Sequence, residues 1–257
     1  MAELGIEPKR SLGQNFLVSD HVIAKIIAVV ASASATNIVE IGPGLGALTD
    51  QLVQLPTAYT GIELDHKLAQ YHHQHGRQVI EADALAVDWS TMPRGVLVSN
   101  LPYQISSSVV IDRSLDVAPF DLMVLMFQKE VALRLVARAS KPEYGMLSVV
   151  AQAMWSIQFL LEASGRDFWP APRVASRVLV FRPAMTAPKA ARKRKFLTFI
   201  KGAFIHPRRI LLNNLVETVS MDRELLQQAW VRRGWDHRLR PQQVTVEQYL
   251  DLFAEIG

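Results

Sequence analysis

The sequence contains no cysteine among its 257 residues. Disulfide bridges and thiolate metal sites are therefore excluded, which agrees with a reducing compartment. No run of about 18 uncharged apolar residues occurs, so we expect no membrane-spanning helix. The first residues are acidic and contain no apolar stretch, so we expect no secretory signal and a cytoplasmic location.

Basic and acidic residues are unevenly distributed along the chain. Residues 1–184 carry 15 Lys and Arg against 17 Asp and Glu, whereas residues 185–257 carry 13 against 7. The net charge of +4 therefore arises in the C-terminal quarter. Because Lys and Arg on phosphates release counterions, a polyanion such as nucleic acid is one candidate partner. A solvated helical surface explains the charge equally well.

Short apolar runs alternate with helical patterns through the first half of the chain. Strands are predicted at residues 37–41, 59–64, 78–82, 95–99 and 122–127. Helices are predicted at residues 22–31, 47–55, 66–74 and 129–137. Such alternation predicts an α/β fold with a predominantly parallel sheet that helices cover on both faces.

The later part of the chain has a different pattern. Two further strands are predicted at residues 151–161 and 174–182, with a Pro-rich loop between them. The residues after Arg182 are basic and show helical periodicity without a clear strand. We therefore predict one large domain, residues 1–182, and a small all-α domain, residues 183–257.

A glycine-rich loop, Gly42-Pro43-Gly44-Leu45-Gly46, lies between the first of these strands and the next helix. Glycines at this position let the backbone approach a ligand closely, and the helix N-terminus adds polarity. The G-x-G-x-G spacing differs from the G-x-G-x-x-G fingerprint of dinucleotide-binding proteins. A tight turn without a ligand remains the alternative interpretation.

Two acidic residues follow the next two strands. Glu63 lies about twenty residues after the loop, where a carboxylate binds ribose hydroxyls. Asp83 follows the third strand, where it could accept a hydrogen bond from the exocyclic amine of an adenine ring. A surface acid and a helix N-cap are the respective alternatives. Together with the loop, the two acids predict a nucleoside site at the carboxyl edge of the sheet.

The turn Asn100-Leu101-Pro102-Tyr103 follows the fourth strand. An exocyclic nucleobase amine is a poor nucleophile, and two acceptors that hold its N–H groups would make the nitrogen more tetrahedral. The Asn100 side-chain oxygen and a backbone carbonyl directed by Pro102 could supply them. The Tyr103 ring offers a surface for stacking a flipped base. A turn with a buried tyrosine is the alternative.

Seven segments resemble, in order, the ribosomal RNA adenine N6,N6-dimethyltransferases of the KsgA type. They are "KRSLGQNFL", "EIGPGLGALT", "GIELD", "NLPYQISS", "FQKEVALRL", "FWPAPRVASRVLVF" and "HPRRILLNNL". The resemblance implies a Rossmann-like class I methyltransferase domain. It also implies dimethylation, with S-adenosylmethionine as methyl donor and no metal, of two adjacent adenines in the 3′-terminal hairpin loop of small-subunit ribosomal RNA. The implied partner is the immature 30S-type subunit, and the implied state is a monomer.

The resemblance also implies roles for individual residues. The S-adenosylmethionine contacts would be Asn15, Leu17, Gly42, Gly44, Glu63, Leu64, Asp83, Ala84 and Asn100. The target amine would be held by Asn100 and the Leu101 carbonyl, which Pro102 orients. Tyr103 and Phe168 would sandwich the adenine, although without the resemblance core packing beside Trp169 is the preferred role for Phe168.

Basic residues in three segments are candidate RNA phosphate contacts. They are Lys9, Arg10, Lys193, Arg194, Arg208 and Arg209. The arginine pair could instead form ion pairs between the domains. His72, His73 and His75 lack the spacing of a metal site, so we predict that they form a solvated helix end.

Three other functions share part of these features. A large-subunit ribosomal RNA methyltransferase of the antibiotic-resistance type would carry the same motifs. An NAD-dependent oxidoreductase would use the glycine loop and Glu63, but it would leave the Asn100–Tyr103 turn unexplained. A non-catalytic RNA-binding assembly factor would need none of the intact donor-site residues.

Overall fold

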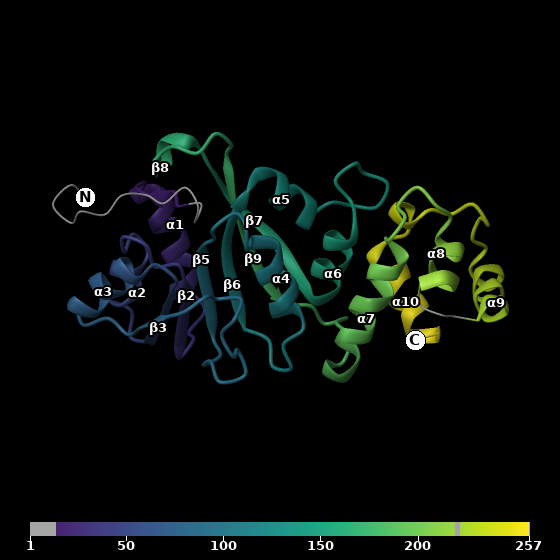
Figure 1. Ribbon diagram of the computed structural model, residues 1–257, viewed down its shortest axis with the longest axis horizontal. Coiled ribbons are helices and arrows are strands. Elements are labelled where there is room, and N and C mark those ends of the chain that lie inside the picture. Colours follow the sequence, from purple (N-terminus) through teal and green to yellow (C-terminus); the bar gives the residue numbers. More distant parts are fainter. Residues whose placement is uncertain (1–13, 219–221, 257) are drawn as a thin grey trace. The chain divides into compact units, whose positions relative to one another are not determined.

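The computed structural model describes residues 14–218 and 222–256 (Figure 1). Contacts divide the chain into two compact units. Unit 1 falls within residues 1–132 and 157–183, and unit 2 within residues 133–156 and 184–257. The chain thus enters unit 2 after Pro183, but residues 133–156, predicted within the first domain, also belong to unit 2.

Unit 1 is built around a seven-stranded sheet with the order β4-β3-β2-β5-β6-β9-β7. The strands are β2 (Asn37–Ile41), β3 (Ala58–Glu63), β4 (Val79–Glu81), β5 (Val96–Asn100), β6 (Leu122–Gln128), β7 (Trp155–Ala163) and β9 (Ser176–Pro183). Neighbours from β4 to β6 are parallel, and β9 runs antiparallel to β6. A two-stranded sheet pairs β1 (Phe16–Leu17) with β8 (Phe168–Trp169).

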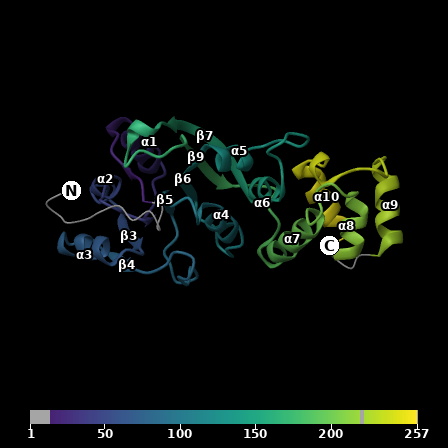
Figure 2. The same ribbon diagram turned by 45° about the horizontal axis from the view of Figure 1, so that its top comes forward.

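Helices bury both faces of the central strands, which explains why these strands are continuously apolar. Helix α1 (Asp20–Ala31) contributes Val22, Ile26 and Val30 to a hydrophobic cluster that includes Val98 and Val124 of the sheet. Figure 2 shows α4 (Ser106–Ser114) on the opposite side of the sheet from α1. The remaining helices of this region are α2 (Thr49–Leu52), α3 (His66–Gln74) and α5 (Lys129–Leu135).

The order of the parallel strands creates a crevice. The chain runs from β2 outward through β3 to β4, and it then returns to place β5 on the other side of β2. The loops that follow β2 and β5 therefore lead away in opposite directions. Ligands of open α/β sheets bind at such a switch point, beyond the carboxyl ends of the strands.

One predicted strand is partly wrong. The apolar run at residues 151–161 begins inside helix α6 (Met146–Met154) and continues as β7 from Trp155. Six of the nine residues of α6 are buried. A helix that is buried on most sides lacks regularly spaced polar residues, so its sequence cannot be distinguished from that of a buried strand. The helix predicted at residues 47–55 is also shorter, because only Thr49–Leu52 is helical.

Unit 2 is helical. Its helices after Pro183 are α7 (Ala190–Ala203), α8 (Leu211–Thr218), α9 (Arg223–Arg233) and α10 (Val246–Ile256). The rings of Phe196, Phe199 and Phe253 pack with centroids 5.2–6.4 Å apart, and Tyr249 joins them across 6.2 Å from Phe199. This aromatic cluster joins α7 to α10.

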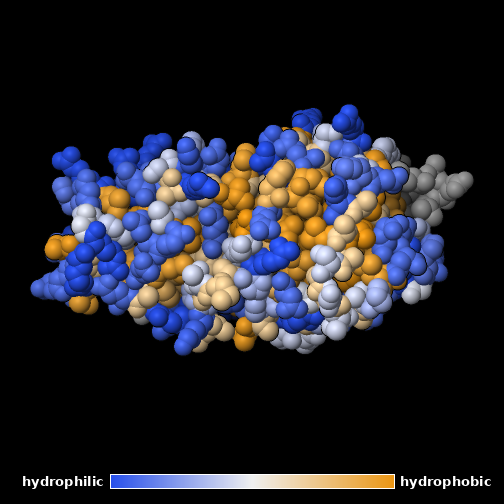
Figure 3. All heavy atoms as spheres, turned by 180° about the vertical axis from the view of Figure 1, so that it is seen from behind, coloured by the Kyte–Doolittle hydropathy of each residue, from blue (hydrophilic) through white to orange (hydrophobic). Residues whose placement is uncertain are grey.

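The surface differs between the parts of the chain. In Figure 3, which views the molecule from behind, apolar residues gather in the middle and right of centre, whereas the left is mainly hydrophilic. Within residues 14–218 and 222–256, no helix is long and apolar enough to cross a membrane.

A buried asparagine of α8 bonds to the C-terminal end of α7. Asn214 Nδ2 donates to the carbonyl oxygens of Ala203, at 2.8 Å, and His206, at 3.0 Å. We expect Asn214→Ala to lower the free energy of unfolding by about 1–3 kcal/mol, because the buried Ala203 carbonyl loses this donor, whereas the His206 carbonyl keeps its bond from Arg209 N at 2.9 Å. Urea unfolding measures the change. The control Asn213→Ala removes only a 3.3 Å exposed contact to Arg223, and an equal loss in both variants would contradict the prediction.

Candidate active site

A cavity of about 220 Å³ lies at the carboxyl edge of the parallel strands. Ten of the predicted site residues line it: Asn15, Gly42, Gly44, Glu63, Leu64, Asp83, Asn100, Leu101, Pro102 and Tyr103. They come from the ends of β2, β3 and β5, from the segment after β4 and from the segment before β1. The structure therefore brings together both predicted halves of the site, the nucleoside site and the asparagine turn.

The glycine loop after β2 is shaped by Gly44. This residue has a φ of +58°, which L side chains rarely adopt, and a Cβ there would lie 3.2 Å from the Phe16 ring. Because Phe16 lines the same cavity, the missing side chain lets the aromatic ring approach the loop backbone. A side chain at position 44 would both strain the loop and displace that ring.

The Glu63 carboxylate at the end of β3 holds the loop in place. Its Oε2 accepts a hydrogen bond from Gly44 N at 3.0 Å, and its Oε1 accepts one from Asp65 N at 2.9 Å. Burial raises the pKa of Glu63, and the backbone hydrogen bonds from Asp65 and Gly44 oppose that shift. Each oxygen keeps further acceptor capacity for a hydroxyl group in the cavity.

Asp83 has two roles at once. It lines the cavity, and its Oδ1 accepts a hydrogen bond from Leu85 N at 2.8 Å. The helix N-cap alternative is wrong in its element, because residues 84–86 form a turn; Asp83 caps that turn with only one carboxylate oxygen. Ala84 does not line the cavity; its side chain is buried and its carbonyl accepts a hydrogen bond from Trp89 Nε1 at 2.8 Å.

The Asn100 side chain is oriented by the segment that precedes β1. Its Nδ2 donates to the Asn15 carbonyl oxygen at 2.9 Å. With the amide nitrogen engaged in this way, Oδ1 is the atom that can accept a hydrogen bond from a ligand. The Tyr103 hydroxyl forms a 3.1 Å hydrogen bond with Ser176 Oγ of β9, which fixes the ring beside the turn. Burial raises the pKa of Tyr103.

Two other predicted residues lie away from the cavity. Leu17 and Phe168 face each other as partners of the β1–β8 pair, and both belong to the hydrophobic cluster under α1. Phe168 is only 4% exposed, whereas Trp169 is 42% exposed and stacks on Phe16 with centroids 6.5 Å apart. In this structure Phe168 thus has the core-packing role, and no face of it is open to a base.

Five lining residues were not predicted as site residues. They are Gln14, Phe16, Leu68, Gln104 and Ile105. Gln14 and Phe16 belong to the segment "KRSLGQNFL", and Gln104 and Ile105 belong to "NLPYQISS". Membership of these two segments is the sequence feature that could have identified them as site residues. Leu68 is an ordinary helix position, and no pattern distinguishes it from core.

The basic residues divide into exposed and buried positions. Arg194, Arg208 and Arg209 are exposed, and Arg209 forms an ion pair with Glu217 inside unit 2. The prediction for Lys193 as a surface contact is wrong, because it is 6% exposed. It precedes Phe196, Leu197 and Ile200 by three, four and seven residues, so it lies on the buried stripe of α7. Lys9 and Arg10 lie outside the described residues.

The histidine prediction for helix α3 is wrong at one position. His73 and His75 are exposed, but His72 is fully buried and its Nε2 donates to the Gly44 carbonyl oxygen at 2.9 Å. It follows Leu68 by four residues, about one helical turn, and therefore lies on the same buried face of the helix. No group of three or more His, Asp or Glu side chains that could hold a metal occurs in the part of the chain that the structure describes.

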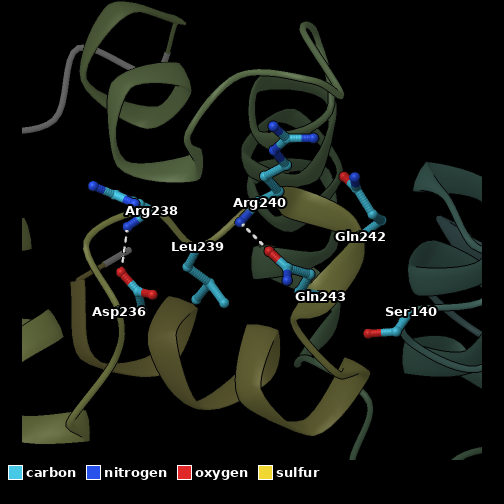
Figure 4. Close-up of a pocket in the computed structure, with 7 residues that line it drawn as sticks. All are labelled: Ser140, Asp236, Arg238, Leu239, Arg240, Gln242 and Gln243. Atoms are coloured by element: carbon cyan, nitrogen blue, oxygen red, sulfur yellow. Dashed lines mark hydrogen bonds between the residues drawn. The ribbon is translucent and has the colours of Figure 1, made fainter.

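A larger cavity of about 440 Å³ lies in unit 2 (Figure 4). In this view Arg238 and Arg240 extend in different directions, and the two hydrogen bonds drawn are local, from Arg238 N to Asp236 Oδ1 and from Arg240 N to Gln243 Oε1. Functional groups do not converge on one point there. The cavity at the strand edge is therefore the better candidate for the active site.

This strand order, with its glycine loop and acidic strand ends, defines a Rossmann-like methyltransferase fold with an added helical unit. The structure is similar to a dimethyladenosine transferase from Plasmodium falciparum, with a TM-score of 0.76, 21% identity and 93% and 96% of the two chains covered. It is also similar to the 23S rRNA methyltransferase ErmE, with a TM-score of 0.70, 24% identity and 94% and 99% covered. These similarities concern the fold.

Sequence comparison identifies the family. The sequence profile described as "Ribosomal RNA adenine dimethylase" matches residues 6–257. The chain is 45% identical over 260 residues to "Ribosomal RNA small subunit methyltransferase A" of Bdellovibrio bacteriovorus, covering 99% of this chain and 94% of the relative. It is 35% identical to the protein of the same name from Chlorobium chlorochromatii, covering 98% and 94%. The chain belongs to the ribosomal RNA adenine dimethylase family.

Glu40 of β2, two residues before the glycine loop, is a second buried carboxylate. Glu40 Oε2 accepts hydrogen bonds from Thr49 Oγ1 and the Tyr59 hydroxyl, both at 2.7 Å. Burial raises the pKa of Glu40 to about 7, against the lowering effect of both hydrogen bonds. The folded protein therefore binds this proton more tightly than the unfolded chain. The resulting stability is present below the unfolded pKa, near 4.5, and is lost as the pH rises through about 7.

We expect Glu40→Gln to remove this dependence, because glutamine can accept both hydrogen bonds and does not titrate. Relative to the variant, the unfolding free energy of the wild type should fall by up to about 1.4 kcal/mol per pH unit between about pH 5 and 7. Urea unfolding at pH 5, 6, 7 and 8 measures the difference. The exposed Glu143→Gln is the control, and parallel curves for the wild type and Glu40→Gln would refute the assignment.

Proposed function

We propose that the protein transfers methyl groups from S-adenosylmethionine to the N6 atoms of two adjacent adenines. The proposed target is the 3′-terminal hairpin loop of small-subunit ribosomal RNA, within an immature subunit. Family membership supports the reaction, and the names of the curated relatives support the small-subunit target. The orientation of Asn100 by the Asn15 carbonyl is the observation in this structure that carries the chemical part of the proposal.

The residues of the cavity fit S-adenosylmethionine. The backbone of Gly42 and Gly44 forms one wall, the Glu63 carboxylate suits ribose hydroxyls, and Asp83 has an oxygen for an adenine amine. Leu64 is 53% exposed beside Glu63 and offers an apolar contact for the purine ring. When bound, S-adenosylmethionine supplies an electrophilic methyl group on a positively charged sulfonium.

Asn100 and Leu101 would prepare the target amine. The Asn100 Oδ1 atom and the Leu101 carbonyl oxygen accept its two N–H groups, which draws the nitrogen lone pair out of conjugation with the purine ring. Pro102 limits the backbone conformation and so directs that carbonyl. The residues then contribute positioning and electrostatic stabilisation, and the amine proton leaves to solvent after transfer.

Tyr103 would hold the flipped adenine by stacking. Its hydroxyl is tied to Ser176 Oγ, so the ring keeps one orientation without help from the ligand. A preorganised ring loses little side-chain entropy when a base stacks on it. Since Phe168 is buried, a second stacking partner on the opposite side of the base would require its side chain to move.

The exposed cations of unit 2 would bind phosphates of the RNA. Arg194 and Arg208 are exposed, and Arg209 is exposed but forms an ion pair with Glu217. The phosphate contribution is electrostatic and independent of sequence, so base selection is left to the cavity. Recognition of splayed bases in a loop agrees with such a division of tasks.

Asn100→Ala tests the proposed amine contact. We expect kcat for methyl transfer to fall by at least about 100-fold, because one of the two acceptors that act on the amine is lost. Transfer from labelled S-adenosylmethionine to immature small subunits is measured, with mapping of the modified base. The control Ser108→Ala alters an exposed position on α4. Modification of large-subunit RNA, or no transfer by folded, cofactor-binding wild type, would refute the proposed function.

Two substitutions at Tyr103 separate its ring from its hydroxyl group. We expect Tyr103→Ala to raise KM for the RNA substrate about tenfold or more, because base stacking contributes about 1–3 kcal/mol. Tyr103→Phe keeps the ring and loses only the contact to Ser176, so its KM should change by less than about threefold. Equal effects of both substitutions would assign the role to the hydroxyl instead.

A further inference from the structure

Helix α3 contributes a buried histidine to the outer side of the glycine loop. His72 Nε2 donates to the Gly44 carbonyl oxygen at 2.9 Å, while Gly44 N, on the same residue, donates to Glu63. The peptide groups on both sides of Gly44 are thus held by side chains from two different elements. His72 does not line the cavity and would not touch a ligand there.

The other ring nitrogen of His72 is engaged by a cation. Arg77 donates from its guanidinium to His72 Nδ1 at 3.0 Å and forms an ion pair with Asp50 Oδ1 at 2.5 Å. Since Arg77 can only donate, Nδ1 must be the acceptor and the Nε2 atom must carry the proton. This fixes one neutral tautomer of His72 in a chain that runs from Gly44 through His72 and Arg77 to Asp50.

The chain of hydrogen bonds also touches the loop at a second point. A Cβ at Gly46 would lie 2.8 Å from Asp50 Oδ1 and 2.9 Å from the Arg77 guanidinium. Gly46 has a φ of +93°, so a side chain there would be strained as well as crowded. The Arg77–Asp50 pair therefore packs directly on the loop backbone at Gly46, two residues after the carbonyl that His72 holds.

We propose that His72, Arg77 and Asp50 act as positioning residues that hold the glycine loop in its cofactor-binding conformation and so set the affinity for S-adenosylmethionine. The inference rests on the proposed function, because that function assigns the cofactor to this loop. A preorganised loop pays less conformational entropy on binding, so loss of the network weakens the complex.

The network makes cofactor affinity depend on pH. The groups that face His72 are the Tyr71 ring from α3, His75 and Arg77 from the segment after α3, and Asp50 from α2. Burial, together with the nearby Arg77, lowers the pKa of His72, and the Gly44 hydrogen bond opposes this shift. Protonation at Nδ1 below that pKa places two donors face to face and releases Arg77 from the ring.

Neighbouring His73 provides a control on the same helix, at an exposed position. Its Nε2 bonds to the Val79 carbonyl oxygen at 2.7 Å, so it joins a histidine ring to a backbone carbonyl in the same way. That carbonyl belongs to β4 and not to the glycine loop. The loss of a histidine-to-carbonyl bond from α3 is common to both positions, whereas the contact with the glycine loop is made only by His72. Comparison of His72→Leu with His72→Gln separates this contact from the burial of the side chain.

Calorimetric titration of the full chain with S-adenosylmethionine tests the inference. At pH 7.5 we expect His72→Leu to raise Kd about tenfold or more, while His72→Gln, whose amide can donate to Gly44 and accept from Arg77, stays within about threefold. Between pH 7 and 5 the wild-type Kd should rise more steeply than that of His72→Gln. His73→Leu should change Kd by less than about threefold.

Amide hydrogen exchange of the cofactor-free protein gives a second readout. We expect His72→Leu to accelerate exchange at residues 44–48 about tenfold, with no such change in His73→Leu. If the wild type binds S-adenosylmethionine but His72→Leu alters neither Kd nor exchange, the inference is overturned and the proposed function stands. If the folded wild type does not bind S-adenosylmethionine, the proposed function is refuted, and the proposed role of the network in cofactor binding is refuted as well.

Discussion

The hydrogen bond between Gly44 N and the Glu63 carboxylate is the constraint on which the site depends. It joins the loop after β2 to the end of β3, and it fixes one wall of the cavity before any ligand arrives. The bond requires a glycine conformation at position 44 and a buried carboxylate at position 63. Parallel pairing of β2 with β3 brings these two strand ends together, so the sheet itself sets the geometry of the site.

The residues to which we assign the chemistry and the residues that orient them come from different parts of the chain. Asn100 ends β5, yet its side chain is oriented by the Asn15 carbonyl 85 positions earlier. Tyr103 follows the same strand and is oriented by Ser176 of β9. Precision at the turn therefore depends on the completed sheet and on the segment before β1, because a four-residue turn could not fix these side chains alone.

The sequence predicted the strand ends well, because glycines, acids and an asparagine stand out against apolar strands. It did not predict which side chains those ends would bury. Phe168 and Lys193 are in motifs typical of function, but the register of β1 with β8 and the helical phase of α7 direct both inward. His72 is the reverse case, since its burial and its bond to Gly44 arise from tertiary packing. Residues 151–154 are predicted as strand because six of the nine residues of α6 are buried, which leaves too few polar positions to reveal a helical period.

The interleaving of the two units has a consequence for how the chain is made. Helix α6 packs against α7 and α10, which the ribosome synthesises at least 35 residues later, and β9 inserts between β6 and β7 only once residue 183 has emerged. Unit 1 can therefore complete its sheet before α7 and α10 have been synthesised and can cover the apolar surface of α6. A chain that stops after Pro183 would keep the cavity-forming strands but expose the part of α6 that α7 and α10 cover, and exposed apolar surface of this kind promotes aggregation during synthesis.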